Sequence, residues 1–212
     1  MKKAIVPLMT LLGAVAVWGV SPSARAQNLL TNGSFETSTT PQCSTSCAAI
    51  PGWTSGGNFT YTWVQSGSYE GFYSSYSAQS GSNFVVFGPV GTDGTLSQTF
   101  SDTAGGTLNV SGWLQGDGTT PSDWSMSLDG TSYVSVNPVP DQGWTRYSFT
   151  APATGSDTFS ISFSNTNDYS AMDNFSVTEG TATVPEPSTL ALFGVGAIGL
   201  LLALRRRSRA QD

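Results

Sequence analysis

The sequence predicts an all-β fold for most of the chain, a jelly-roll β-sandwich ectodomain, followed by a single C-terminal transmembrane helix. Short runs of β-branched and aromatic residues recur between turns rich in Gly, Ser, Asn and Asp, about 8 to 12 residues apart, as in sandwiches and jelly rolls. Several of these runs alternate apolar and polar residues, and no window of the central region has the spacing of an amphipathic helix.

The first half of the central region contains three expected strands. Residues 84–87 are apolar on both faces, which is typical of a strand buried on both sides. Residues 96–100 form the second run. The third, 108–114, has apolar side chains on one face and Trp113 on the other.

The second half contains four more expected strands. Residues 124–128 alternate with serines and end at an Asp-Gly pair, 129–130, which favours a tight hairpin turn. Residues 147–149 also alternate. Residues 159–163 give the clearest period-two pattern, and 173–177 place alternate side chains on one face of the last strand.

Three tryptophans complete the expected interior. Trp53, Trp113 and Trp144 are expected to lie in the core, whereas the pattern around Trp124 does not decide its position.

The N-terminus has the pattern of a secretory leader. Two lysines precede an apolar stretch, 4–20, and the sequence Ala24-Arg25-Ala26 forms a small-x-small cleavage site. Residues 1–26 are therefore expected to be a signal peptide, with the β-sandwich domain at 27–179.

The C-terminus predicts a membrane span. A proline-bearing linker, 180–188, leads into an apolar segment, 189–204, that is at the short end of what crosses a bilayer as a helix. The basic tail 205–212 is expected to stay cytoplasmic by the positive-inside rule. A buried helix of a soluble domain is the alternative, but this segment is apolar on all sides and precedes four arginines.

The triplet Pro185, Glu186 and Pro187, with the apolar span and the arginines after it, resembles the PEP-CTERM sorting signal of Gram-negative bacteria. The resemblance implies cleavage by an exosortase in a host that makes an exopolysaccharide matrix. It also implies transient anchoring in the inner membrane by the C-terminal helix, then the cell surface or secretion as the final location.

The exported region is strongly acidic. Between residues 28 and 179, one cation, Arg146, stands against twelve acids, a net charge of about −11. Such a domain should repel nucleic acid, whose binding requires Lys and Arg on phosphates. It also offers carboxylate oxygens to divalent cations.

The only two cysteines, Cys43 and Cys47, are expected to form a local disulfide, because an exported protein folds in an oxidising compartment. The lack of histidine and of further cysteines nearby argues against a metal site there.

The segments 28–36, 51–53 and 172–177 resemble the two ends of galactose-binding-like jelly rolls, which include carbohydrate-binding modules. The resemblance implies that the first and last strands lie side by side. It also implies a structural Ca²⁺ held by Glu36 and Asp173 with backbone carbonyls. Alternatively, the two are ordinary solvated acids.

Catalytic chemistry has little support. No histidine is present and no lysine follows Lys3, which excludes Ser-His-Asp and Schiff-base mechanisms. A pair of carboxylates could still hydrolyse a glycosidic bond, but most acids lie in turn-like contexts, such as the Asp-Gly pairs at 93–94, 117–118 and 129–130. The expectation is therefore that the protein is not an enzyme.

Residues 59–76 hold seven aromatics among Ser, Gly, Gln and Glu. Aromatic rings pack on the apolar faces of sugars, and polar neighbours bind their hydroxyls. The expected ligand-binding residues are Tyr69, Tyr73 and Tyr76, in an exposed loop, with Trp63. An alternative places Trp63 with Phe59 and Tyr61 on one core-facing side of a strand.

Two functional hypotheses follow. The first is a surface or matrix protein whose domain binds glycan or exopolysaccharide. The alternative is a non-binding structural envelope or matrix protein stabilised by calcium. A carboxylate-dependent enzyme acting on glycans is a third, more distant possibility.

Overall fold

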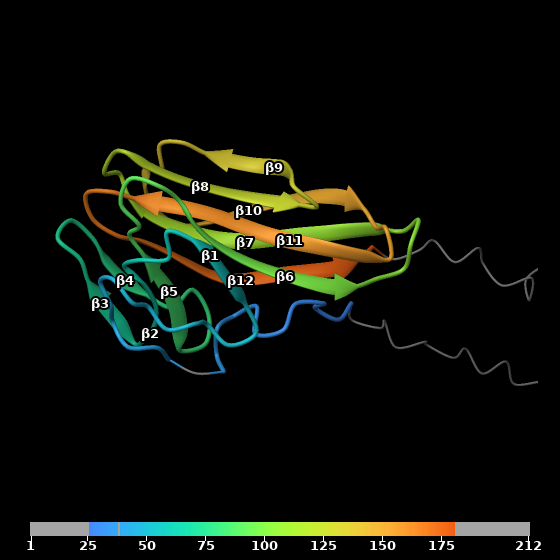
Figure 1. Cartoon of the computed structure of the whole chain (residues 1–212), viewed down its shortest axis with the longest axis horizontal. Coiled ribbons are helices and arrows are strands. Elements are labelled where there is room, and N and C mark those ends of the chain that lie inside the picture. The colour runs from blue at the N-terminus through green and yellow to red at the C-terminus, as the bar shows by residue number, and fades with distance from the viewer. Residues whose placement is uncertain (1–25, 38, 181–212) are drawn as a thin grey trace, which may run out of the picture.

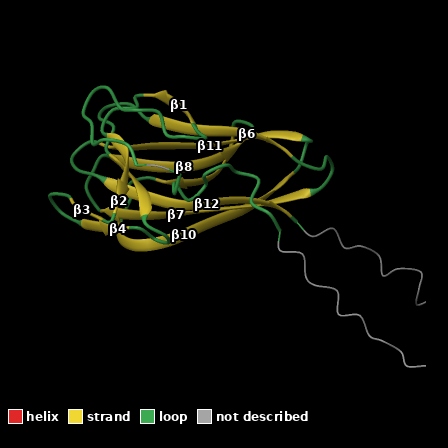
Figure 2. Cartoon of the chain, turned by 90° about the horizontal axis from the view of Figure 1, so that it is seen from below, coloured by secondary structure: helices red, strands yellow, loops and turns green. Residues whose placement is uncertain are grey.

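The computed structural model describes residues 26–37 and 39–180, which form a β-sandwich of two five-stranded sheets and a small two-stranded hairpin (Figures 1 and 2). These residues contain no helix, and so none that could cross a membrane. The predicted jelly-roll class is confirmed. The signal peptide, linker, transmembrane helix and basic tail lie almost entirely outside the described residues.

Every paired strand runs antiparallel to its neighbour. The first sheet has the order β1 (Thr54–Gly57), β6 (Gly94–Ser101), β11 (Ser156–Asn165), β8 (Ser122–Leu128), β9 (Thr131–Val136). The second has the order β10 (Asp141–Pro152), β7 (Thr107–Asp117), β12 (Ser170–Glu179), β5 (Asn83–Phe87), β2 (Thr62–Ser66). The hairpin is β3 (Ser68–Glu70) and β4 (Ser75–Ser77).

The seven predicted strands all occur. The segment 84–87 lies in β5, whose five residues are buried on both faces, and 159–163 alternates in β11 as expected. The turn between β8 and β9 consists of Asp129 and Gly130, with φ of 49° and 76°. Both are left-handed, as a two-residue hairpin turn of this type requires.

The main core lies between the two sheets and is rich in aromatic rings. Trp124 is fully buried there, and Trp53 packs against Phe35, Phe159 and Phe175. The expectation for Trp53 is therefore confirmed. Trp124, whose position the sequence pattern did not decide, lies in the core.

The expectation for Trp113 is wrong. Trp113 is half-buried and belongs to neither apolar cluster, because it points to the outer side of β7 while Leu114 points inward. Trp144 is also only half-buried and packs on a smaller cluster outside the sandwich.

The opening segment lies beside the last strand, as the resemblance implied. The Leu29 N–H donates to the Val177 carbonyl at 2.7 Å, and the Phe175 N–H donates to the Gly33 carbonyl at 2.8 Å. A Cβ at Gly33 would lie 2.3 Å from the Phe175 carbonyl oxygen, so this close approach requires glycine. The segment reaches β12 through turns rather than as a regular strand.

A second apolar cluster covers the outer face of β2 and β5, beneath the hairpin β3–β4. Its buried members are Trp63, Tyr76, Phe84, Val86 and Ala171. This second layer exists because the hairpin folds back over the sheet rather than extending into solvent (Figure 1).

Phe59 and Trp63 do not lie on the same side of the chain. The alternative that placed Phe59, Tyr61 and Trp63 together on one core-facing side of a strand is therefore wrong. Phe59 packs on the main core and Trp63 on the outer cluster. Tyr61, between them, has φ of 50°, and a left-handed residue interrupts the alternation of a strand.

The hairpin lies at one end of the sandwich, and the described chain begins and ends at the other (Figure 1). Residues near the hairpin therefore lie at the opposite end of the sandwich from Gly180, where the described chain ends.

Candidate functional site

The hairpin β3–β4 presents two aromatic rings at its tip. Tyr69 pairs with Tyr76 across the strands, and the Gly71 N–H donates to the Ser74 carbonyl at 2.9 Å to close the turn. Phe72 is 87% exposed and Tyr73 is 71% exposed. These are the two most exposed large apolar side chains in the described residues, and exposed rings of this size mark interaction surfaces.

A carboxylate from the loop between β11 and β12 holds this tip. Asp168 is buried, and its two oxygens accept the backbone N–H of Phe72 at 3.3 Å and of Tyr73 at 2.9 Å. The Asp168 N–H in turn donates to the Asn165 side-chain oxygen at 3.3 Å. A Cβ at Gly71 would lie 3.2 Å from the carboxylate, so glycine permits this approach.

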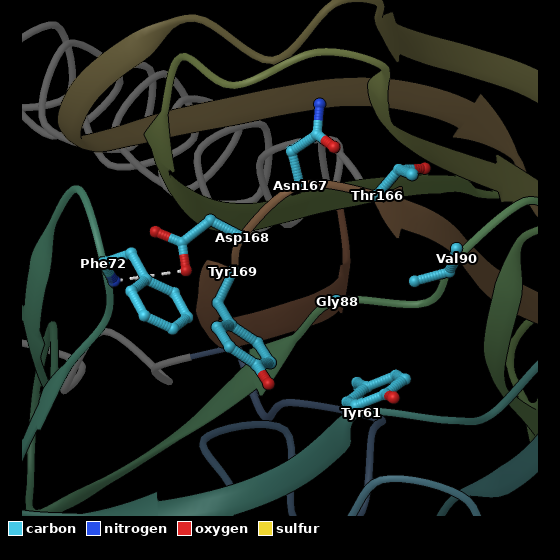
Figure 3. Close-up of a pocket in the computed structure, with 8 residues that line it drawn as sticks. All are labelled: Tyr61, Phe72, Gly88, Val90, Thr166, Asn167, Asp168 and Tyr169. Atoms are coloured by element: carbon cyan, nitrogen blue, oxygen red, sulfur yellow. Dashed lines mark hydrogen bonds between the residues drawn. The ribbon is translucent and has the colours of Figure 1, made fainter.

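One hollow, of about 200 Å³, lies on one side of the tip (Figure 3). Aromatic side chains Tyr61, Phe72 and Tyr169 line it, together with Asn167 and Asp168. The rings of Phe72 and Tyr169 lie next to each other, with the Asp168 carboxylate above them in this view.

A second hollow, of about 320 Å³, also borders Phe72 and Tyr169. Gln42, Tyr69 and Glu70 complete its lining. Phe72 and Tyr169 line both hollows, so the two hollows adjoin the same rings and make up an aromatic surface with polar groups at its margins.

Tyr169 is held in place by rings and by the backbone. Its ring centroid lies 5.2 Å from that of Trp63 and 5.5 Å from that of Tyr69, both edge to face. The Tyr76 hydroxyl donates to the Tyr169 carbonyl at 2.5 Å. A Cβ at Gly88 would lie 2.8 Å from the Tyr169 ring, so the ring can occupy this position only over a glycine.

The hydroxyls of Tyr69 and Tyr169 stay protonated at neutral pH. Burial raises the pKa of Tyr69 to about 12, and the nearby Tyr169 and Asp168 add to the rise. Burial also raises the pKa of Tyr169, and the electrostatic effects of Tyr61 and Asp168 raise it further. Each phenol can therefore both donate and accept a hydrogen bond to a neutral polar ligand.

The structure separates the four predicted ligand-binding residues. Tyr73 is exposed at the tip, as expected, and Tyr69 is half-buried at the edge of a hollow. The expected exposure of Tyr76 is wrong, because its side chain points under the hairpin and is 2% exposed. Trp63 is 1% exposed and supports Tyr69 and Tyr169 from below, so its ring is not free to stack on a ligand.

Sequence reasoning missed Phe72 as a site residue, and it missed Tyr61, Asn167, Asp168 and Tyr169. Phe72 belonged to the aromatic stretch and carried a usable signal, since Gly71 precedes it and favours a turn. Residues 167–169 had no such signal, because only the fold brings them to a hairpin about a hundred positions earlier.

Glu36 and Asp173 lie on either side of one loop, 79–83. The Glu36 carboxylate accepts the N–H of Ser82 and Asn83, both at 2.9 Å. The Asp173 carboxylate accepts two N–H groups from Gln79 and Ser80, at 3.0 and 3.2 Å. The two acids predicted to share a cation are therefore close together.

The burial of Asp173 changes its protonation equilibrium. Asp173 is fully buried, and burial raises its pKa to about 7, with a further rise from the charge of Glu36 and a partial offset from the amide hydrogen bonds. Within the described residues, no group of three or more His, Cys, Asp or Glu side chains could hold a metal. Further ligands for Ca²⁺ would therefore have to be carbonyl or amide oxygens, which Ca²⁺ accepts.

Cys43 and Cys47 form the predicted disulfide, with Cα atoms 5.3 Å apart. Cys43 packs against the outer apolar cluster, next to Gln42 at the second hollow. The disulfide therefore fixes one margin of the candidate site.

Residues 183–207 match the model of the PEP-CTERM protein-sorting motif. The chain therefore carries this motif, and the prediction for Pro185, Glu186 and Pro187 is confirmed. No curated protein matches the chain.

Structures of carbohydrate-binding modules resemble the sandwich. TmCBM61 in complex with β-1,4-galactotriose is 20% identical, with 73% of this chain and 100% of that chain covered and a TM-score of 0.51. The CBM22-1 xylan-binding domain of Paenibacillus barcinonensis Xyn10C is 17% identical, with a TM-score of 0.46. The match covers 76% of this chain and 100% of that domain. At this identity the likeness to TmCBM61 shows the shared jelly-roll fold and does not carry over its ligand.

Proposed function

We propose that this protein is processed by an exosortase and that its domain binds glycan without catalysis, at the aromatic surface around Phe72 and Tyr169. The sorting motif indicates an exported protein sorted to the cell surface. Transient anchoring in the inner membrane and final placement on the surface or in an exopolysaccharide matrix belong to the proposal.

The observation that carries the binding proposal is the exposed pair Phe72 and Tyr73, held by the buried Asp168 carboxylate. An exposed aromatic side chain on a loose loop would lose conformational entropy on binding. Fixing the backbone of the tip beforehand reduces that loss. The rings offer flat apolar faces, and Glu70, Gln42 and Asn167 offer hydrogen bonds to hydroxyl groups.

The position of this surface supports the same function. Because the hairpin lies opposite the two ends of the described chain, a domain tethered through its C-terminal linker would present the hollows away from the membrane (Figure 1). A matrix polymer could then reach them while the tail is still attached.

A structural, calcium-stabilised role is the second candidate. The buried Asp173, with Glu36 nearby and a raised pKa, favours it. We propose that Glu36 and Asp173 hold Ca²⁺ with nearby oxygens, and that the ion's contribution is to neutralise the two carboxylates and fix the loop 79–83. This role is compatible with glycan binding.

Affinity electrophoresis of the exported protein through gels containing the host's exopolysaccharide tests the binding proposal. The Phe72→Ala/Tyr73→Ala variant should lose retardation yet keep its melting temperature, because both rings are exposed. Tyr133→Ala is a control for the loss of a partly exposed ring outside the lining of both hollows; because Tyr133 stacks on Phe149, with ring centroids 4.5 Å apart, its melting temperature is measured alongside. Equal retardation of the double variant and the wild type would refute this site.

A further inference from the structure

A groove of about 550 Å³ lies on the outer face of the second sheet, away from the aromatic surface. It runs across β10, β7 and β12, which pair in that order. The hairpin borders this face at one side, where the Trp144 Nε1–H donates to the Ser77 carbonyl at 2.9 Å and the Gln115 Nε2–H donates to the Ser75 carbonyl at 3.2 Å. Residues 79 and 80 cover Asp173 of β12 at the same side, where their N–H groups donate to its carboxylate.

The strand register arranges the polar side chains of this face in rows. Ser148 of β10 pairs with Ser111 of β7, which pairs with Ser176 of β12. The next row consists of Thr150, Asn109 and Thr178. Directly opposite side chains on one sheet face lie about 5 Å apart. Ser111 is buried, so the first row offers the hydroxyls of Ser148 and Ser176, and the second row offers three adjacent hydrogen-bonding groups.

The row nearest the hairpin differs, because it consists of Arg146, Trp113 and the buried Asp173. Arg146 is exposed and lines the groove, and it is the only Lys or Arg between residues 26 and 180. In the part of the chain that the structure describes, it forms no ion pair. Trp113 is half-buried and packs in neither apolar cluster, so part of its ring is exposed beside Arg146, next to the groove rather than in its lining.

A guanidinium beside a ring and rows of hydroxyls is suited to one kind of ligand. Arginine binds carboxylates with two parallel hydrogen bonds, and serine, threonine and asparagine bind hydroxyl groups. The ligand should therefore carry both carboxylates and many hydroxyls. A densely charged polyanion is disfavoured, because the twelve acids of the domain repel it and only one cation attracts it.

We propose that this groove is a second binding site, for a polysaccharide that carries carboxylates on its sugar rings, with Arg146 binding a carboxylate and Trp113 contacting the adjacent ring. The site is on a different surface from the hollows around Phe72. The inference therefore stands whether or not those hollows bind glycan.

Retention of the exported protein in gels containing sparsely charged polyuronates, a partly methyl-esterified polygalacturonate or a partly esterified alginate, tests this proposal, with fully methyl-esterified polygalacturonate as the uncharged counterpart. All gels contain EDTA, so that calcium cannot bridge the polymer to the acidic domain. The wild type should be retained about tenfold more strongly by a polyuronate than by the ester, since charge-assisted hydrogen bonds are the strong ones. Arg146→Gln should abolish that difference, and Arg146→Lys should restore part of it.

Two controls separate this site from the first. Phe72→Ala/Tyr73→Ala should keep the preference for the polyuronate over its ester, whatever its effect on other glycans. Thermal unfolding of Arg146→Gln should match the wild type, because the side chain is exposed. A wild type that does not prefer either polyuronate to the ester would overturn the proposal, and so would an unchanged preference in Arg146→Gln.

Discussion

The carboxylate of Asp168 accepts the backbone N–H of Tyr73 at 2.9 Å, although the two residues are 95 positions apart in the sequence. The same carboxylate also accepts the N–H of Phe72. The most exposed rings of the domain are thus positioned by a buried acid on a different loop. The geometry of the proposed binding surface depends on the fold of the whole sandwich rather than on the hairpin alone.

Replacing that acid should loosen the tip. In Asp168→Asn, one acceptor oxygen becomes an NH₂ group that faces a backbone N–H, so a buried hydrogen bond is lost. We expect a destabilisation of about 1–3 kcal/mol and faster amide exchange at Phe72 and Tyr73, measured by urea unfolding and hydrogen exchange. Asp141→Asn removes the same charge at an exposed position and serves as control. Unchanged exchange at the tip would show that the carboxylate does not hold it.

A methyl group at Gly88 should displace Tyr169. A Cβ there would lie 2.8 Å from both the Tyr169 ring and the Asp168 carbonyl oxygen, closer than real Cβ contacts. Gly88→Ala is therefore expected to lose about 1–3 kcal/mol of unfolding free energy through overpacking and to weaken glycan retention. Gly143→Ala, where a Cβ would meet nothing within 4 Å, should leave both unchanged. Equal stability of the two variants would contradict the proposed contact.

Much of the fold could be predicted from local patterns. The alternation in 159–163 and the Asp-Gly pair at 129–130 gave one strand and one turn correctly, because side-chain period and left-handed backbone are properties of a few adjacent residues. The disulfide between Cys43 and Cys47 followed from the compartment and their proximity.

The candidate site was harder to predict because its parts are separated in sequence. Tyr76 lies among serines, which is typical of an exposed loop, yet it is buried because β4 folds back over β5. Tyr61 reverses the side-chain alternation with a single positive φ, which no local pattern indicated. Asp168 could not be connected with Phe72 before the strand order was known.

Asp173 should make stability depend on pH. Its folded pKa is raised to about 7 by burial, above the value of about 3.9 in an unfolded chain. The folded state therefore binds the proton of Asp173 more tightly than the unfolded state does. The stability that this protonation contributes is fully present below about pH 4 and is lost as the pH rises through 7. Each pKa unit corresponds to about 1.4 kcal/mol, so the loss is of the order of several kcal/mol.

Chemical unfolding in the presence of EDTA between pH 5 and 8 measures this effect. Burial also raises the pKa of Asp123, so the titration of Asp123 lowers the free energy of unfolding in the same direction as the pH rises. The informative quantity is therefore the difference between wild type and Asp173→Asn, which should have a flatter profile. Parallel profiles for the two proteins would show that Asp173 does not titrate in this range.

Calcium should act on the same carboxylate in the opposite direction. Above pH 7, ionised Asp173 and Glu36 repel each other without a cation between them, and an ion that binds only the folded state stabilises it. At a calcium concentration 100 times the dissociation constant, the gain is about 2.7 kcal/mol. The melting temperature at pH 8 should therefore rise when calcium replaces EDTA, and the pH dependence of stability described above should become shallower.

Glu36→Gln keeps an oxygen that can accept the N–H groups of Ser82 and Asn83 but lacks the charge, so it should fold and show a smaller rise in melting temperature. Asp141→Asn, which changes an acid on the far strand β10, should respond as the wild type does. If calcium leaves the wild-type melting temperature unchanged, the two acids serve only to hold the loop 79–83 through its amide groups.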